Sequence, residues 1–167
     1  MILIIYLHHI VLFGGGGFAM TISILSAAKR LGERSNWALS NLALQKLSYL
    51  SHMFFMGRHA GTPLVHGHFE AWDYGPVHPD LYHRAKMFGS SPVREFIFLG
   101  VEDASGPERD VLDEAYDALG SVRAGKLVNA THRPGGAWET NYRPGVMGII
   151  IPNSDILAEY KSLERGK

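Results

Sequence analysis

The sequence predicts a mainly helical α+β fold, a single domain with a small β element. Most of the chain after residue 20 carries apolar residues at spacings of three and four, the period of a helix with one buried face. The interval 64–72 shows partial alternation of apolar and polar residues, which is typical of a short strand or hairpin. With 167 residues and 46% hydrophobic content, the chain can bury one core, and it shows no internal repeat or interdomain linker.

The most regular pattern is a helix that follows residue 40 and ends near Gly57. Ser40 or Asn41 is suited to cap its N-terminus. Polar and apolar residues recur here at spacings of four, three and four, which places the two sets on opposite faces. Other apolar residues widen the apolar arc, so the helix is predicted to be mostly buried. The polar set is Asn41, Gln45, Ser48 and His52, and the apolar set is Ala43, Leu47, Leu50 and Phe54.

Lys46 interrupts the apolar arc of this helix. A lysine in such a place either extends its amine to water or pairs with a carboxylate, because an isolated buried ammonium group is very costly. We therefore expect a structural lysine with an exposed amine, or an ion pair with Glu70 or Asp73 from the segment that should pack nearby.

The remaining elements follow from spacing and from helix breakers. A helix that begins at Thr21 is expected to stop at Gly32, and Pro79 suits the first position of a helix that Gly89 ends. The interval 93–101 has no pattern that assigns it. The other expected elements are a turn at 74–76, helices at 107–119 and 122–131, a long loop at 132–145, a strand at 147–151 and a helix at 152–163.

Charge and cysteine content restrict the class of protein. Lys plus Arg and Asp plus Glu number 16 each, so the net charge is zero, whereas nucleic-acid-binding proteins usually carry a basic excess. The absence of cysteine excludes disulfides and thiolate zinc sites and suits a reducing cytoplasm. A neutral surface also suits a protein that associates with a partner.

Residues 1–19 differ in composition from the rest of the chain. An apolar run is followed by four glycines, and no charged residue precedes Lys29, so the basic start of a secretory signal is missing. We expect a non-native or disordered N-terminal extension, with Met20 as the natural initiator and residues 20–167 as the domain. A membrane anchor is the alternative, although the glycines interrupt the apolar run.

The chain carries no complete catalytic or metal-binding motif. His66 and His68 would share one face of a strand, with His78 and His83 near in sequence, but no HExxH motif, cysteine pair or compact acidic cluster completes a ligand set, so surface or capping roles are favoured. Thr131 and His132 could supply two members of a catalytic set, or could cap a helix end and form a loop. We expect no enzymatic activity, no metal and no cofactor.

Aromatic and arginine residues in two irregular segments predict a protein-binding surface. Tyr and Trp are common anchors of interfaces, although they also attach turns to a core, which is the favoured role for Trp72. The expected surface comprises the turn 72–79, the exposed face of the helix after it and the loop 132–143. We expect Arg84, Trp138 and Arg143 to be accessible to solvent. The predicted partner-binding residues are Trp72, Tyr74, Arg84, Arg133, Trp138 and Arg143.

Three motifs resemble those of the Panacea-domain family, the SocA-like antitoxins, which also include phage-associated proteins. The similarity runs from about Thr21 to Glu164, and the family usually has proline where this chain has Ala137. The motifs are Leu44-Gln45-Lys46-Leu47-x-Tyr49, then Glu70-Ala71-Trp72-x-Tyr74-Gly75-Pro76-Val77-x-Pro79-x-Leu81-Tyr82, and finally Thr131-His132-x-x-Gly135-x-Ala137-Trp138.

The resemblance implies a cytoplasmic antitoxin that binds and neutralises a cognate protein toxin. Neutralisation would proceed by occlusion, or by delivery of the toxin to a cellular protease such as ClpXP, with the antitoxin as a proteolytic adaptor. No nucleic-acid or membrane partner is expected. The motif residues expected to be structural are Gln45, Lys46, Tyr49, Gly75, Pro76, Pro79, Tyr82, Thr131 and His132.

Two other classes of function stay open. A DNA-binding or phage-associated regulatory protein would need several basic residues on one helix face, and the helix after Pro79 offers His83, Arg84 and Lys86. A hydrolase would need an acid–base pair in a pocket.

Overall fold

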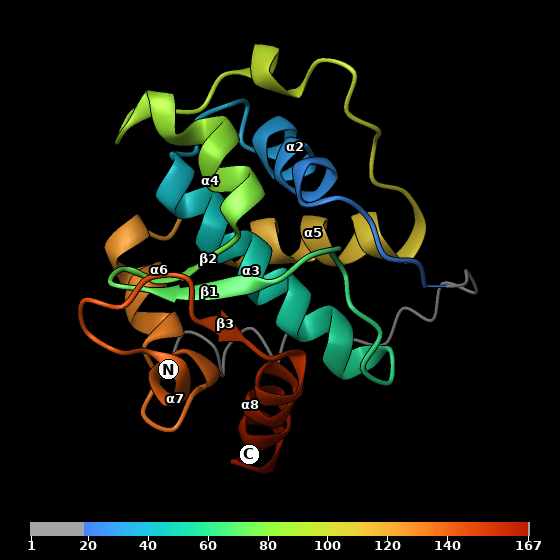
Figure 1. Ribbon diagram of the computed structural model, residues 1–167. Coiled ribbons are helices and arrows are strands. Elements are labelled where there is room, and N and C mark those ends of the chain that lie inside the picture. Colours follow the sequence, from blue (N-terminus) through green and yellow to red (C-terminus); the bar gives the residue numbers. More distant parts are fainter. Residues whose placement is uncertain (1–18, 167) are drawn as a thin grey trace.

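The computed structural model describes residues 19–166 and has a mainly helical α+β architecture, as predicted (Figure 1). Helix α3 (Asn41–Arg58) runs through the middle and packs against most other elements. The other elements are α2 (Ile24–Arg34), β1 (Phe69–Trp72), β2 (Gly75–Val77), α4 (Pro79–Ala85), the 3-10 helices η1 (Lys86–Phe88) and η2 (Glu95–Phe98), α5 (Gly106–Leu119), α6 (Ala124–Thr131), α7 (Ala137–Asn141), β3 (Ile150–Ile151) and α8 (Asn153–Arg165).

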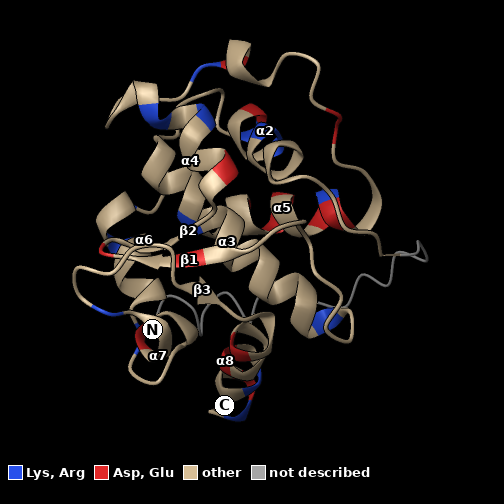
Figure 2. Cartoon of the chain, viewed as in Figure 1, with Lys and Arg blue, Asp and Glu red and all other residues tan. Residues whose placement is uncertain are grey.

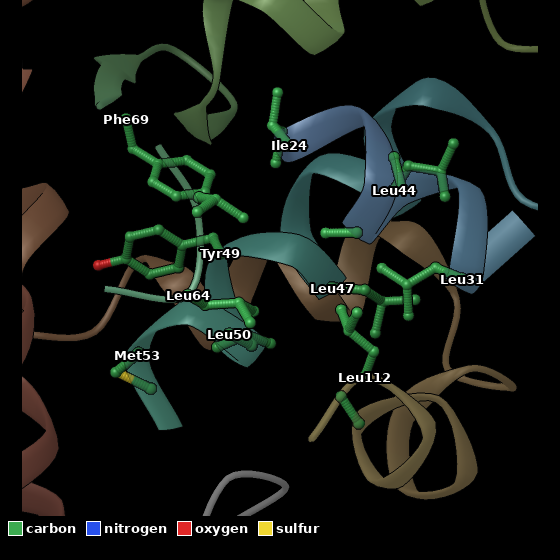
Figure 3. Packing of buried hydrophobic residues seen from close by; sticks show 14 of the residues in the cluster. Ile24, Leu31, Leu44, Leu47, Tyr49, Leu50, Met53, Leu64, Phe69 and Leu112 are labelled. Carbon is green, nitrogen blue, oxygen red and sulfur yellow. The ribbon is translucent and has the colours of Figure 1, made fainter. Parts of the chain in front are cut away.

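Local sequence signals explain where α3 begins and why it is central. Ser40 has an extended backbone conformation, and its Oγ accepts a hydrogen bond from the Ala43 N–H at 3.3 Å, as an N-cap residue does. All its residues are buried except Leu42, Gly57 and Arg58, which confirms the predicted burial. The core is shared with neighbouring elements: in Figure 3, Leu47 lies beside Leu31 of α2 and Leu112 of α5.

The sheet has three antiparallel strands in the order β2-β1-β3. Residues of β1 alternate in burial, so Phe69 and Ala71 face the core while Glu70 and Trp72 are partly exposed on the other face. The edge of the Phe69 ring packs against Tyr49 of α3, with ring centroids 5.3 Å apart. In the view of Figure 1, α4 lies above the sheet, and α7 and α8 lie below it.

Several expected boundaries were wrong. Helix α2 continues through Gly32 to Arg34. Glycine serves close packing at this position and does not end the helix, since a Cβ on residue 32 would lie 2.4 Å from the ring of Trp37. The expected loop 132–145 contains α7, and the strand expected at 147–151 is reduced to Ile150–Ile151. The unassigned interval 93–101 contains the single turn η2. The structure otherwise agrees with the predicted helices to within two residues at each end, with two exceptions. The helix expected from Thr21 begins at Ile24, and the α-helical part of the Pro79 helix stops at Ala85, where η1 follows.

The N-terminal prediction falls on residues that the structure does not describe. Residues 1–18, which carry the expected extension and its alternative, the membrane anchor, lie outside the described part. Ala19 packs on the core, and the Met20 N–H donates a hydrogen bond to Glu108 Oε1. Between residues 19 and 166, no helix combines the length and the apolar character that a bilayer span requires.

Candidate partner-binding site

The amide of Gln45 holds the outer edge of the β1–β2 hairpin against α3. The His78 N–H donates to Gln45 Oε1 at 2.8 Å, and Gln45 Nε2 donates to the His78 carbonyl at 3.2 Å. A neighbouring strand would offer the same donor and acceptor to this edge. Gln45 therefore takes the place of a fourth strand, and the β2 edge has no free backbone group at His78.

Lys46 supplies the next contact along the same edge. Its Nζ donates to the Pro76 carbonyl at 2.8 Å, and the side chain is fully buried. Because proline has no N–H, this carbonyl is the only backbone group that Pro76 presents. Burial lowers the pKa of the Lys46 amine to about 7, so a large share of the amine is uncharged at neutral pH.

The expectation for Lys46 was therefore wrong. Its amine is neither exposed nor paired with a carboxylate among the described residues. The two expected partners make other contacts: Glu70 Oε2 accepts from Trp72 Nε1 at 2.7 Å, and Asp73 Oδ1 accepts from the Tyr142 hydroxyl at 2.8 Å. A backbone carbonyl satisfies an amine with a lowered pKa without adding a second buried charge.

Gly75 brings the hairpin into contact with the end of α6. It has a φ of +94°, and a Cβ at this position would lie 2.7 Å from Thr131 Oγ1, 3.0 Å from Lys46 Cε and 3.1 Å from His132 Nε2. Burial and the nearby Lys46 charge lower the pKa of His132, whose Nε2 is buried and has no hydrogen-bond partner within the described part of the chain. Residues from all three motifs thus meet around one glycine.

Trp138 fastens α7 to the hairpin and is not an exposed anchor. One face of its ring stacks on His132, with centroids 3.6 Å apart, and it also stacks on Tyr142 at 4.6 Å. Its Nε1 donates to the Trp72 carbonyl at 2.8 Å, and only 8% of the residue is exposed. The prediction that Trp138 is accessible was wrong, because its ring faces and its N–H are already occupied within the domain.

Glu159 of α8 is a buried acid that the sequence interpretation missed. Its Oε2 accepts from the Ala137 N–H at 2.9 Å and from the Tyr49 hydroxyl at 3.3 Å. Burial raises the pKa of both Glu159 and Tyr49. One signal was present: Glu159 lies three residues after Ile156, on the face expected to be buried.

An open groove lies at the tip of the hairpin and has a volume of about 500 Å³. Tyr74 at the tip is 71% exposed, and Val146 and Met147 across the groove are 51% and 73% exposed. Trp72 packs against Tyr82 inside it, with ring centroids 4.7 Å apart. We call this the tip groove; its apolar and aromatic lining is Leu42, Trp72, Tyr74, Val77, Tyr82, Val146 and Met147.

The segment that matches a known protein family contains the residues that meet around Gly75. A family model described as "Antitoxin SocA-like, Panacea domain" matches residues 44–139, more than half of the chain. The chain belongs to the SocA-like Panacea-domain family. The match begins in α3 and ends in α7, so it includes the hairpin and all three motifs.

A curated relative supports this membership. The antitoxin SocA of Caulobacter vibrioides (strain NA1000 / CB15N) is 36% identical to this chain over 111 residues. The alignment covers 60% of this chain and 58% of the relative, so the chain spans less than two thirds of that antitoxin. No solved structure matches the chain.

Within the Panacea domain, the predicted binding residues divide into two groups. Trp72 and Tyr74 line the tip groove, and Arg143 is exposed two residues before Gly145, which also lines it. Arg84 is exposed as predicted, but its Nε donates to the Ile97 carbonyl, which directs it toward η2. Arg133 is partly buried, and its positive charge lowers the pKa of the Glu159 carboxyl, which opposes the larger effect of burial.

The Panacea-domain histidines do not converge. His66 and His68 are exposed, whereas His78 is buried and its Nε2 hydrogen-bonds to the His66 carbonyl at 2.9 Å. Among residues 19–166, no three His, Cys, Asp or Glu side chains form a group that could hold a metal ion.

Charged residues gather on a different part of the domain. Figure 2 shows acidic and basic residues along α2 and α5, where Arg30 pairs with Asp113 at 2.7 Å and Arg34 pairs with Asp117. Arg58 of α3 pairs with Glu114 at 2.7 Å. The charges of this face compensate one another, whereas the tip groove presents mainly apolar surface.

Proposed function

We propose that this protein is an antitoxin that binds and neutralises a cognate protein toxin, and that it does so without catalysis. Membership of the SocA-like Panacea family carries the proposal, since the curated relative is itself an antitoxin. The hairpin geometry supports it further, because the family motifs converge on a rigid hairpin rather than on an open pocket with an acid–base pair.

The tip groove and Arg143 are the proposed contact surface for the toxin. Exposed apolar patches on a small domain commonly mark binding sites, and Tyr74, Val146 and Met147 form such a patch. The hairpin beneath them is fixed by buried hydrogen bonds to Gln45, Lys46 and Trp138, so little ordering would be needed on binding.

Binding to the product of the neighbouring open reading frame tests this function. We expect that product to be toxic when expressed alone, to co-purify with this chain, and to lose its toxicity in its presence. Tyr74→Ala and Arg143→Ala should weaken binding at least tenfold without a change in melting temperature, because both side chains are exposed. Leu99→Ala, at the C-cap of η2, is also exposed and apolar; it is the matched control and should bind normally. Unchanged affinity in both groove variants would place the interface elsewhere.

We propose that the toxin is neutralised in the cytoplasm either by occlusion or by delivery to a protease such as ClpXP. These two routes differ in the surfaces that they require. An adaptor needs a second surface for the protease while the tip groove holds the toxin. Toxin degradation in a purified mixture of protease, toxin and antitoxin separates them. Loss of toxin only when the antitoxin is present supports delivery, and an intact but inactive toxin supports occlusion.

A further inference from the structure

The outer edge of β3 presents backbone groups that pair with no other strand of residues 19–166. The Ala71 N–H donates to the Ile149 carbonyl at 2.8 Å, and Glu70 lies opposite Ile150. In an antiparallel pair, residues alternate between those that bond to the partner strand and those that point away. The N–H and carbonyl of Ile150 therefore point away from β1, and neither has a hydrogen-bond partner among residues 19–166.

The two edges of the sheet differ in whether their outward backbone groups have hydrogen-bond partners within the described chain. The outward groups of β2 are satisfied by Gln45 and Lys46. The β3 strand is only two residues long and α7 lies near it, but the edge carries no charge or proline that would repel an added strand, since residues 145–151 contain neither. Ile150 is 50% exposed and lies on the same sheet face as Trp72. An open, apolar strand edge is the feature to which extended segments add.

The tip groove continues this edge. Val146 and Met147 line the groove and lead directly into the strand that carries Ile150, while Trp72 forms its inner wall. A strand added beside β3 would send alternate side chains to one sheet face, where the groove could hold one of them. Edge and groove together therefore suit an extended segment with alternating apolar residues.

Charges beside the groove indicate the composition of that segment. Lys86 follows Tyr82 by four residues and so lies near it, and Arg143 precedes the groove residue Gly145. Within the described chain neither cation forms an ion pair with a carboxylate. Asp73, the acid of the groove lining, already accepts from Tyr142. The charge pattern therefore favours an acidic residue on the incoming segment.

We propose that the toxin adds an extended segment as a β strand to the edge of β3 and inserts an apolar side chain into the tip groove. The segment has alternating apolar residues and an acidic residue near Lys86 or Arg143. This inference rests on the proposed antitoxin function and specifies how the partner is bound.

Replacement of one backbone donor tests strand addition. Ile150→Pro removes the outward N–H without removing a hydrogen bond to β1, so it should bind the product of the neighbouring reading frame at least tenfold more weakly. Ile150→Val keeps the N–H and a β-branched side chain and should stay within twofold of the parent. Amide hydrogen exchange on the unmodified complex is an independent measurement, in which the Ile150 amide should become protected by at least tenfold.

Each outcome bears on a different proposal. If the parent binds the product but Ile150→Pro binds equally well and the Ile150 amide gains no protection, strand addition is overturned and the antitoxin function stands. If the parent does not bind the product or suppress its toxicity, the antitoxin function fails and this inference fails with it. If sedimentation shows a parent dimer that Ile150→Pro converts to a monomer without toxin, the occupant is a second copy of this chain, which overturns the assignment to the toxin.

Discussion

At the scale of single residues, Lys46 shows how the domain uses a buried amine without an ion pair. Its acceptor is the Pro76 carbonyl, and its pKa falls from 10.5 to about 7 because burial disfavours the charged form. The sequence could suggest that Lys46 was unusual but could not identify its acceptor, since every residue carries a carbonyl. Glu70 and Asp73 were the visible candidates, and both are engaged with aromatic side chains.

The lowered pKa predicts how stability depends on pH. Between about pH 7 and 10.5 the unfolded chain holds a proton on Lys46 that the folded chain lacks, so the free energy of unfolding increases with pH. The destabilisation is complete below pH 7 and disappears as pH rises through 10.5. Lys46→Met should remove this dependence, so the parent should gain on the variant by up to roughly 1.4 kcal/mol per pH unit.

Urea denaturation of both proteins at pH 7, 8 and 9 measures this difference. Loss of the Lys46–Pro76 hydrogen bond adds a cost that is constant with pH and does not affect the slope. Lys161→Met, at an exposed position on α8, serves as the control and should follow the parent at every pH. Parallel curves for the parent and Lys46→Met would contradict the lowered pKa.

At the scale of elements, the reliability of prediction depended on how local the stabilising contacts are. Helix α3 was predicted correctly because its cap and its periodicity lie within the segment itself. The Tyr74-Gly75-Pro76 sequence indicated a turn, but the expected bounds 74–76 were wrong: the turn lies at Asp73 and Tyr74, and Gly75 and Pro76 pair with β1 as part of β2. Helix α7 was missed because its first N–H is held by Glu159, 22 residues away. The role of Trp138 was missed for the same reason, since Trp72 lies 66 residues before it.

The contact between the hairpin and α6 predicts a specific sensitivity at Gly75. Gly75→Ala adds a methyl group 2.7 Å from Thr131 Oγ1 at a φ of +94°, so it should lower the free energy of unfolding by about 2–4 kcal/mol. Gly89→Ala is the matched control, because Gly89 also has a positive φ but no atom of the described residues lies within 4 Å of the added Cβ. It should lower the free energy of unfolding by the backbone strain alone, about 1–3 kcal/mol, and by less than Gly75→Ala. Equal losses in chemical denaturation would show that close packing at Gly75 is unimportant.

At the scale of the whole molecule, the domain has a charged side and an apolar side with different roles. On the α2–α5 side, basic and acidic residues pair with one another. On the sheet side, one strand edge and one groove are available to bind a partner. Zero net charge gave no indication of the binding surface, because it is a sum over the whole chain and does not show which charges pair with one another, as those of α2 and α5 do. The identity of the toxin is a property of the partner and could not be predicted from this chain.

The domain is expected to function from Met20 onward. A chain that begins at Met20 would place a charged α-amino group beside the buried Glu108 carboxylate, which already accepts from the Met20 N–H. We therefore expect its melting temperature to be at least that of the full chain, with equal affinity for the toxin. Thermal melts and a binding titration of the two proteins measure this. Insolubility of the shorter chain, or failure to protect cells that the full chain protects, would refute the expectation.

The enclosed amine of Lys46 has a consequence for covalent chemistry in the cell. An uncharged amine is a good nucleophile toward acylating agents, yet no reagent can reach Lys46 while the hairpin covers it. An acyl group added there would have no space in the folded domain, because Gly75 and Thr131 already occupy the surroundings. Acylated Lys46 would therefore be found only on chains modified before folding or during opening of the hairpin. The extent of this modification would thus record how often the chain is unfolded or its hairpin is open.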